Sequence, residues 1–161
     1  MNETFTQFLN ELRADPDLIH QALRIHVSER SDDLTHNEMI SELRESVGHE
    51  EELQELLKHL EHDQDGLEQA ALIYFESAWE DDLQKPSIRS AFRHAKNKLP
   101  VIEIAILAVV AMYGMHLIAT HGVLEKIIKR KPDGSYEETE KREPFAPVVS
   151  AMVRLLATKT G

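Results

Sequence analysis

Histidine and carboxylate side chains are the residues of this chain that could do chemistry. There are nine histidines, and with Asp and Glu they are the usual zinc ligands of a chain without cysteine. The closest spacings are Asp17 with His20, Asp33 with His36, and His59 with His62, with His49 shortly before the last pair. One helical pair cannot hold a metal without further ligands, and no H-E-x-x-H sequence is present. We therefore interpret these histidines as solvated helix residues and predict no metal and no cofactor.

Other catalytic arrangements are equally weak. The chain has no cysteine for a thiolate nucleophile, no G-x-S-x-G and no glycine-rich phosphate loop. The carboxylate run Glu80, Asp81 and Asp82 ends a predicted helix, where such runs are normally solvated. His116 and His121 could act as haem ligands or proton carriers within a membrane, but a polar helix end is the simpler interpretation. We predict a non-enzyme, with a His/carboxylate metal-dependent enzyme as a remote alternative.

Charge is distributed unevenly along the chain. The net charge is −11, and residues 1–83 carry 22 acidic but only 5 basic side chains. Residues 84–98 then hold five basic side chains and no acidic one. An acidic body disfavours binding to nucleic-acid phosphates, so we predict no nucleic-acid partner. The N-terminus lacks the apolar stretch of a secretory signal, so we expect it to be cytoplasmic, and the absence of cysteine fits a reducing compartment.

Apolar residues recur with helical spacing six times in residues 1–98. We expect the second helix to begin at Asp15 and Pro16, the third at Thr35 and Glu38, and the sixth at Pro86. We expect the third helix to end at Gly48 and the fourth near Asp65 and Gly66. Each helix has one apolar stripe, which is typical of a bundle that closes around a shared core. The sequence therefore predicts a mainly α fold that begins with an acidic bundle of about six short amphipathic helices.

A long apolar segment follows in residues 101–119, interrupted only by Glu103 and His116. A helix that is apolar on all sides lies either in a membrane or inside a protein core. Nineteen residues of helix span about 28 Å, close to the roughly 30 Å hydrocarbon thickness of a bilayer. The side chains expected to face lipid or the core are Ile104, Ile106, Leu107, Val109, Val110, Met112 and Tyr113.

Basic residues flank this segment on both sides. Those expected at lipid headgroups, or at the rim of a core helix, are Arg89, Arg93, Lys96, Lys98, Lys129, Arg130 and Lys131. Cationic flanks are typical of membrane helices, so we favour a membrane anchor. The alternative is a helix that the other helices enclose, as a core or an oligomer interface.

The remaining residues predict a β-hairpin and a last helix. Pro132, Asp133 and Gly134 match a type I turn with a glycine bulge. Pairing outward from this turn sets Lys129 opposite Glu137, and Lys126 opposite Glu140 in the same register. A short apolar helix is expected over residues 145–157, so residues 99–161 form a second module beside the acidic bundle of residues 1–98.

Together these patterns predict a non-enzymatic, membrane-associated interaction protein. The acidic domain would bind a protein partner, and the helix at 101–119 would anchor the chain at the cytoplasmic side of a membrane, single-pass or peripherally. The alternative is a soluble cytoplasmic adaptor, all-helical, whose apolar helix is core or oligomer interface. Homo-oligomer formation is left open.

Overall fold

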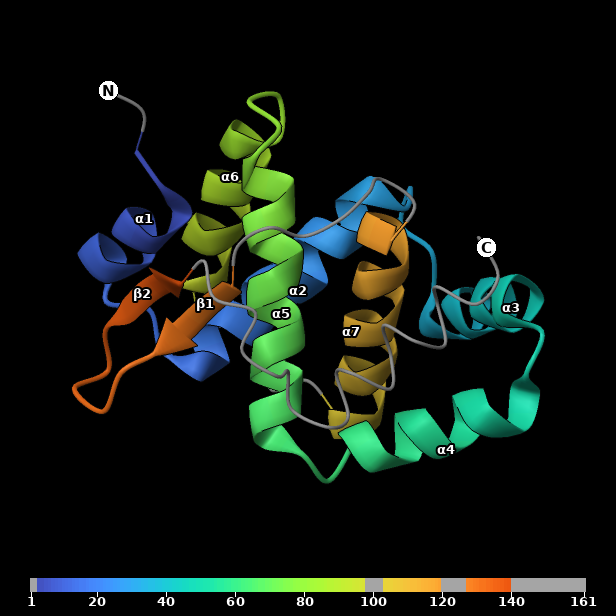
Figure 1. Ribbon diagram of the computed structural model, residues 1–161. Coiled ribbons are helices and arrows are strands. Elements are labelled where there is room, and N and C mark those ends of the chain that lie inside the picture. Colours follow the sequence, from blue (N-terminus) through green and yellow to red (C-terminus); the bar gives the residue numbers. More distant parts are fainter. Residues whose placement is uncertain (1–2, 98–102, 120–126, 140–161) are drawn as a thin grey trace.

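Seven helices and two short strands make up the described part of the chain, which comprises residues 3–97, 103–119 and 127–139 of a computed structural model (Figure 1). The helices are α1 (Phe5–Leu12), α2 (Pro16–Arg30), α3 (His36–Val47), α4 (Glu50–Leu60), α5 (Gln64–Trp79), α6 (Lys85–Ala95) and α7 (Ile104–Ala119). The strands are β1 (Ile127–Arg130) and β2 (Tyr136–Thr139). The expected mainly α fold is confirmed.

Local capping explains where several helices begin and end. At α2, the Asp15 carboxylate accepts a hydrogen bond from the Leu18 amide, and Pro16 occupies the first turn. At α3, Thr35 and Glu38 form the reciprocal pair of a capping box. Gly48 then ends α3 with a φ of 71°, a left-handed conformation that glycine adopts without steric cost. These three limits agree with the sequence prediction.

The predicted stop of the fourth helix at Asp65 and Gly66 is wrong. The helix α4 already ends at Leu60, and Asp63 caps the start of α5 by accepting a hydrogen bond from the Gly66 amide. Asp63 is a strong N-cap residue, so the chain restarts as helix before the glycine and Gly66 is buried in the first turn of α5.

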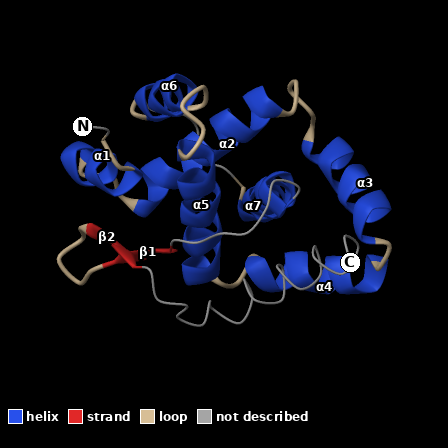
Figure 2. Cartoon of the chain, turned by 45° about the horizontal axis from the view of Figure 1, so that its top comes forward, coloured by secondary structure: helices blue, strands red, loops and turns tan. Residues whose placement is uncertain are grey.

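The helices α5 and α7 form the centre of the molecule. They pack directly on each other, and α2 packs on both (Figure 1). The helices α1 and α6 lie on one side of this pair, and α3 and α4 lie on the other (Figure 2). The contacts of α3 and α4 run chiefly to α7, so α7 joins these two helices to the rest of the described chain.

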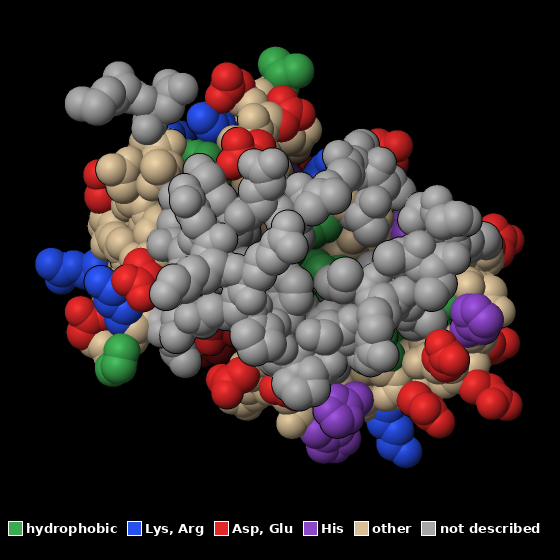
Figure 3. All heavy atoms as spheres, viewed as in Figure 1, with side chains coloured by type: hydrophobic (Ala, Val, Ile, Leu, Met, Phe, Trp, Pro, Cys, Tyr) green, Lys and Arg blue, Asp and Glu red, His purple; other side chains and the backbone are tan. Residues whose placement is uncertain are grey.

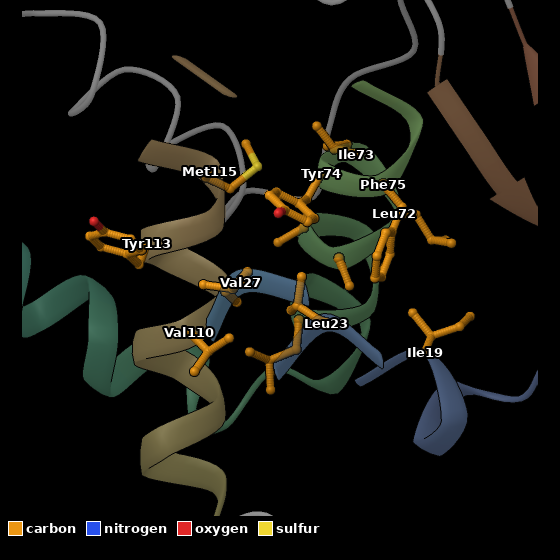
Figure 4. Packing of buried hydrophobic residues seen from close by; sticks show 14 of the residues in the cluster. Ile19, Leu23, Val27, Leu72, Ile73, Tyr74, Phe75, Val110, Tyr113 and Met115 are labelled. Carbon is orange, nitrogen blue, oxygen red and sulfur yellow. The ribbon is translucent and has the colours of Figure 1, made fainter. Parts of the chain in front are cut away.

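One hydrophobic core includes side chains of all seven helices. Figure 4 shows Val110 and Met115 of α7 beside Leu23 and Val27 of α2 and Tyr74 of α5. The helix α7 approaches α5 closely at Gly114, where an added Cβ would lie 3.2 Å from Cδ2 of Tyr74. The described part of residues 99–161 thus packs in the same core as the helices of residues 1–98.

The strands pair in antiparallel order around a tight turn. Lys129 lies opposite Glu137, the register expected from pairing outward from the turn. The Lys131 amide donates to the Ser135 carbonyl over 2.7 Å, and the Gly134 amide donates to the Lys131 carbonyl over 3.0 Å. Gly134 has a φ of 90°, which suits the glycine of such a turn. The second predicted pair (Lys126 with Glu140) and the helix predicted at 145–157 lie outside the described residues.

A side-chain clamp attaches the strand pair to α1. The Asn10 amide group donates to the carbonyl of Tyr136 over 2.9 Å and accepts from the Tyr136 amide over 2.7 Å. The Tyr136 ring is buried, and its hydroxyl donates to the Ala14 carbonyl over 3.2 Å. Asn10 therefore pairs with β2 as a neighbouring strand would, which satisfies two backbone groups at the edge of the ribbon.

Candidate interaction surfaces

The apolar side chains predicted for the long helix are mostly buried within the chain. Leu107, Val109, Val110, Met112 and Tyr113 are each at most 5% exposed. Their neighbours come from α2 and α5 on one side and from α3 and α4 on the other. Apolar surface that four helices already cover needs no further partner.

The first turn of α7 is more exposed than the rest of the helix. Ile106 is half-buried, and Ile104 is 42% exposed. At sixteen residues, α7 is about 24 Å long. Within the described ranges, no helix combines the length and the hydropathy needed to cross a bilayer.

The predicted basic residues of α6 form a stripe on its outer side. Arg93 and Lys96 are exposed, whereas Arg89 is half-buried. The Arg89 guanidinium lies 2.9 Å from a carboxylate oxygen of Glu3 and 5.1 Å from the ring centroid of Trp79. A cation over an indole face is stabilised by the ring quadrupole. The sequence pattern predicted a cation at lipid headgroups or at the rim of a core helix here, and it did not indicate this contact.

An aromatic cluster explains why the Arg89 guanidinium is held in this position. The rings of Phe8 and Trp79 are stacked with centroids 5.3 Å apart, and the Arg89 guanidinium also lies 5.4 Å from the Phe8 centroid. Lys85 approaches the same indole at 5.5 Å, and the Trp79 indole N–H donates to the Glu3 carbonyl. Arg89 and Trp79 therefore fasten the N-terminal segment to α6 and α5.

The other predicted basic residues lie at the strand pair. Lys129 and Arg130 belong to β1, and Lys131 begins the turn. The Lys131 ammonium is 3.6 Å from a carboxylate oxygen of Glu137, so this cation is partly neutralised within the ribbon. The remaining predicted rim residue, Lys98, lies outside the described residues.

The outer sides of α3 and α4 are strongly acidic. Their apolar stripes are buried, and the exposed glutamates are Glu38, Glu42, Glu45, Glu50, Glu51, Glu52 and Glu55. We call these side chains the acidic face; carboxylates gather over α3 and α4 at the right of the space-filling view (Figure 3). Arg44 and Lys58 are the exposed cations of these two helices, and Arg44 lies 2.8 Å from Glu50. The acidic face therefore keeps a large excess of negative charge.

The histidines that sequence analysis singled out do not converge in the described ranges. His36, His49, His59 and His62 are exposed, and His121 lies outside these ranges. No group of three or more histidine, aspartate or glutamate side chains there is placed to hold a metal ion. Burial lowers the pKa of His20, with Asp17 opposing the shift. The described residues thus supply no ligand set for a metal.

A polar contact joins α3 to α7 at the border of the acidic face. The Tyr113 hydroxyl donates a hydrogen bond to the Glu42 carboxylate, and burial raises the pKa of Tyr113. The His116 ring lies 5.8 Å from the Tyr113 ring. Burial lowers the pKa of His116, and the charge of Glu42 opposes this shift. Tyr113 thus reaches from the core to hold α3 in place. No sequence pattern pointed to this contact.

A cavity of about 470 Å³ lies between the strand turn and the corner that joins α1 to α2. Its charged lining residues are Arg13, Asp15 and Asp133. The two carboxylates already accept local hydrogen bonds, from the Leu18 amide and from Ser135 respectively. The cavity therefore has a mixed charge and no dominant chemical preference.

Comparison with protein-family models, with curated proteins and with solved structures found no match. The function is therefore argued from the residues of this chain.

Proposed function

We propose that this chain is a non-enzymatic interaction protein, in which α7 is the core and the acidic face binds a basic surface of a protein partner. The observation that carries the proposal is the position of α7 between α2 and α5 on one side and α3 and α4 on the other. Because α3 and α4 bury their apolar stripes and pack on α7, their glutamates stay exposed on the outer sides of both helices.

The buried position of α7 favours the adaptor alternative over the membrane anchor. Met112 is 0% exposed and Val110 is 4% exposed. These two side chains lie about 200° apart around the helix, so opposite sides of α7 are covered. An anchor would have to withdraw these side chains from the core. Leu43 of α3 and Leu53 of α4, which are fully buried, would then lose apolar cover. Transfer of apolar surface to water makes that withdrawal unfavourable.

Charge is the property by which this surface would recognise a partner. Exposed carboxylates at close spacing create a negative potential that speeds encounter with a basic surface and excludes acidic ones. Binding of this kind weakens as salt rises, because the Debye length shortens. A basic protein surface is therefore the partner chemistry that fits the acidic face.

Affinity purification from the cells that express the protein tests this function. The full chain is compared with Glu51→Gln/Glu55→Gln, which neutralises the centre of α4, and with Asp32→Asn/Glu80→Gln as a control. The control removes the same charge from exposed positions that follow α2 and α5. Loss of a protein partner in the first variant alone supports the proposal. Equal recovery with all three proteins contradicts it.

Alkaline carbonate extraction separates the adaptor from the anchor. We expect the full chain, expressed without detergent, to be released into the supernatant. Retention in the membrane pellet would overturn the core role of α7. Metal analysis of the same preparation tests the enzyme alternative, which requires a stoichiometric ion.

A further inference from the structure

The outer stripe of α6 carries positive charge that the described residues only partly neutralise. Lys85, Arg89, Arg93 and Lys96 follow at intervals of four, four and three residues, which places them on one side of the helix. Lys85 pairs with Asp82 at 2.8 Å, and Arg89 pairs with Glu3 at 2.9 Å. Arg93 and Lys96 are exposed and have no ion pair within residues 3–97, 103–119 and 127–139. We call these four residues the basic stripe.

The centre of the acidic face also places like charges close together on one helix, and these charges are negative. Glu51 and Glu55 are separated by four residues on α4, and Glu52 and Glu55 by three. Like charges at these spacings destabilise a helix, and the same holds for Arg89, Arg93 and Lys96 on α6. Both surfaces therefore gain stability when a surface of opposite charge covers them.

The two surfaces cannot cover each other within one chain. The helix α6 packs on α2 and α5, whereas α3 and α4 pack on α7. Figures 1 and 2 show them on opposite sides of the central pair α5 and α7. The fold thus separates the two surfaces from each other, and no described element of the chain pairs one with the other.

We propose that the occupant of the basic stripe is the acidic face of a second copy of this chain. This rests on the proposed function and identifies the basic protein surface that the acidic face binds. Charge complementarity carries the assignment, because one chain presents both signs at opposite sides. A membrane or nucleic acid fits less well, since a surface that is anionic throughout would also meet the Glu3 and Asp82 carboxylates that pair with the stripe.

Repulsion between the net charges of two copies does not prevent this contact. Exposed charges separated by more than about 10 Å are largely screened at 0.1 M salt, whereas facing residues interact at close range. The two contacting patches differ, so the interface is head-to-tail, and each added copy leaves one patch free. The assembly therefore grows as a chain, or closes as a ring if the rotation allows it.

Sedimentation velocity of the full chain tests the proposal. Two single-patch variants are used, Arg93→Gln/Lys96→Gln in the basic stripe and Glu51→Gln/Glu55→Gln in the acidic face. Asp32→Asn/Glu80→Gln is the charge-matched control, and circular dichroism checks that every variant is folded. At low salt we expect the unmodified chain and the control to form species larger than a dimer. In about 1 M NaCl, where the Debye length is about 3 Å, these species should dissociate.

Mixing the two variants gives the sharpest result. Each alone should lose about tenfold or more in association constant, a change of about 1.4 kcal/mol. An equimolar mixture has one intact patch of each kind, so we expect a 1:1 dimer that does not grow. A monomeric unmodified chain at low salt, or a mixture that stays monomeric, would overturn the proposal.

Two further outcomes would also overturn this proposal, and they can be told apart from a failure of the proposed function. Binding of anionic phospholipid vesicles or duplex DNA that is lost only in Arg93→Gln/Lys96→Gln would assign the basic stripe to that ligand. A monomeric chain whose cellular partner is still lost in Glu51→Gln/Glu55→Gln would leave the acidic face with a different protein partner. If the chain is monomeric and Glu51→Gln/Glu55→Gln still binds the cellular partner, both proposals are wrong.

Discussion

His26 Nδ1 lies 2.7 Å from the Tyr74 hydroxyl oxygen, in the buried space where α2 packs on α5. Burial, together with the nearby Arg30 guanidinium, lowers the pKa of His26 to about 4. Burial also raises the pKa of Tyr74 to about 12, although Arg30 opposes this shift. Both side chains are therefore neutral at neutral pH, and the hydrogen bond joins two uncharged groups inside the core.

Protonation of His26 should make the protein less stable in mild acid. The unfolded chain takes up this proton near pH 6.5, and the folded chain only near pH 4. The contribution of neutral His26 to the free energy of unfolding is therefore fully present above pH 6.5 and is lost as the pH falls toward 4. We expect a loss of roughly 2 kcal/mol between pH 7 and pH 5, measured as the denaturant midpoint.

The matched variants for this prediction are His26→Phe and His59→Gln. The first removes the buried titrating ring and should reduce the pH dependence, even though loss of the Tyr74 hydrogen bond lowers stability at every pH. The second changes an exposed histidine and should retain the full dependence. An unchanged pH dependence in His26→Phe would exclude His26 as its source.

Enlarging Gly114 should separate α7 from α5. A Cβ there already lies 3.2 Å from the Tyr74 ring, so Gly114→Leu overpacks the interface and should cost about 1–3 kcal/mol. Thermal unfolding measures the effect. Ala105→Leu is the control, because Ala105 is an exposed residue of the same helix and the change should be nearly neutral. Equal melting temperatures for the two variants would contradict the close approach.

Removing the Asn10 clamp should release the strand pair from α1. The Asn10→Ala variant loses both hydrogen bonds to the Tyr136 backbone, and we expect a cost of about 1–3 kcal/mol. Hydrogen exchange of the Tyr136 amide should accelerate. Asn97→Ala, at an exposed position after α6, should change neither quantity. Unaltered protection of Tyr136 in Asn10→Ala would mean that the strands hold without the clamp.

Deleting residues 99–161 tests whether the first six helices fold alone. Leu43, Leu53 and other apolar residues of α3 and α4 would lose their cover from α7, so we expect the 1–98 fragment to unfold without a sharp transition. Circular dichroism during urea denaturation, with the full chain as reference, measures this. A cooperative transition with full helicity would support two modules divided near residue 98.

Local signals predicted local structure well. Thr35 with Glu38 marked the start of α3 and Gly48 its end, because a cap depends on residues a few positions apart. The turn at Pro132, Asp133 and Gly134 predicted the pairing of Lys129 with Glu137 for the same reason. The fourth helix end was placed wrongly because Asp63, an earlier cap, outweighs the glycine after it.

Long-range contacts were not predictable from one sequence. The clamp joins Asn10 to Tyr136, and the cation–π contact joins Arg89 to Phe8. Neither pair has a periodic or spacing signal, since their meeting depends on how whole helices pack. The choice between membrane and core for α7 depends on the same packing. Hydropathy measures how apolar a helix is and not which helices surround it.

Hydrogen exchange of the α7 amides is the measurement that tests the central claim most directly. The full chain is purified without detergent, and peptides covering Ile104–Ala119 are compared with those from the exposed turn at Pro132 and Gly134. We predict that α7 exchanges slowly, near the rate of global unfolding, and that anionic phospholipid vesicles leave this rate unchanged. Rapid exchange of α7 in water that becomes slow only with vesicles would contradict a core helix and restore the anchor.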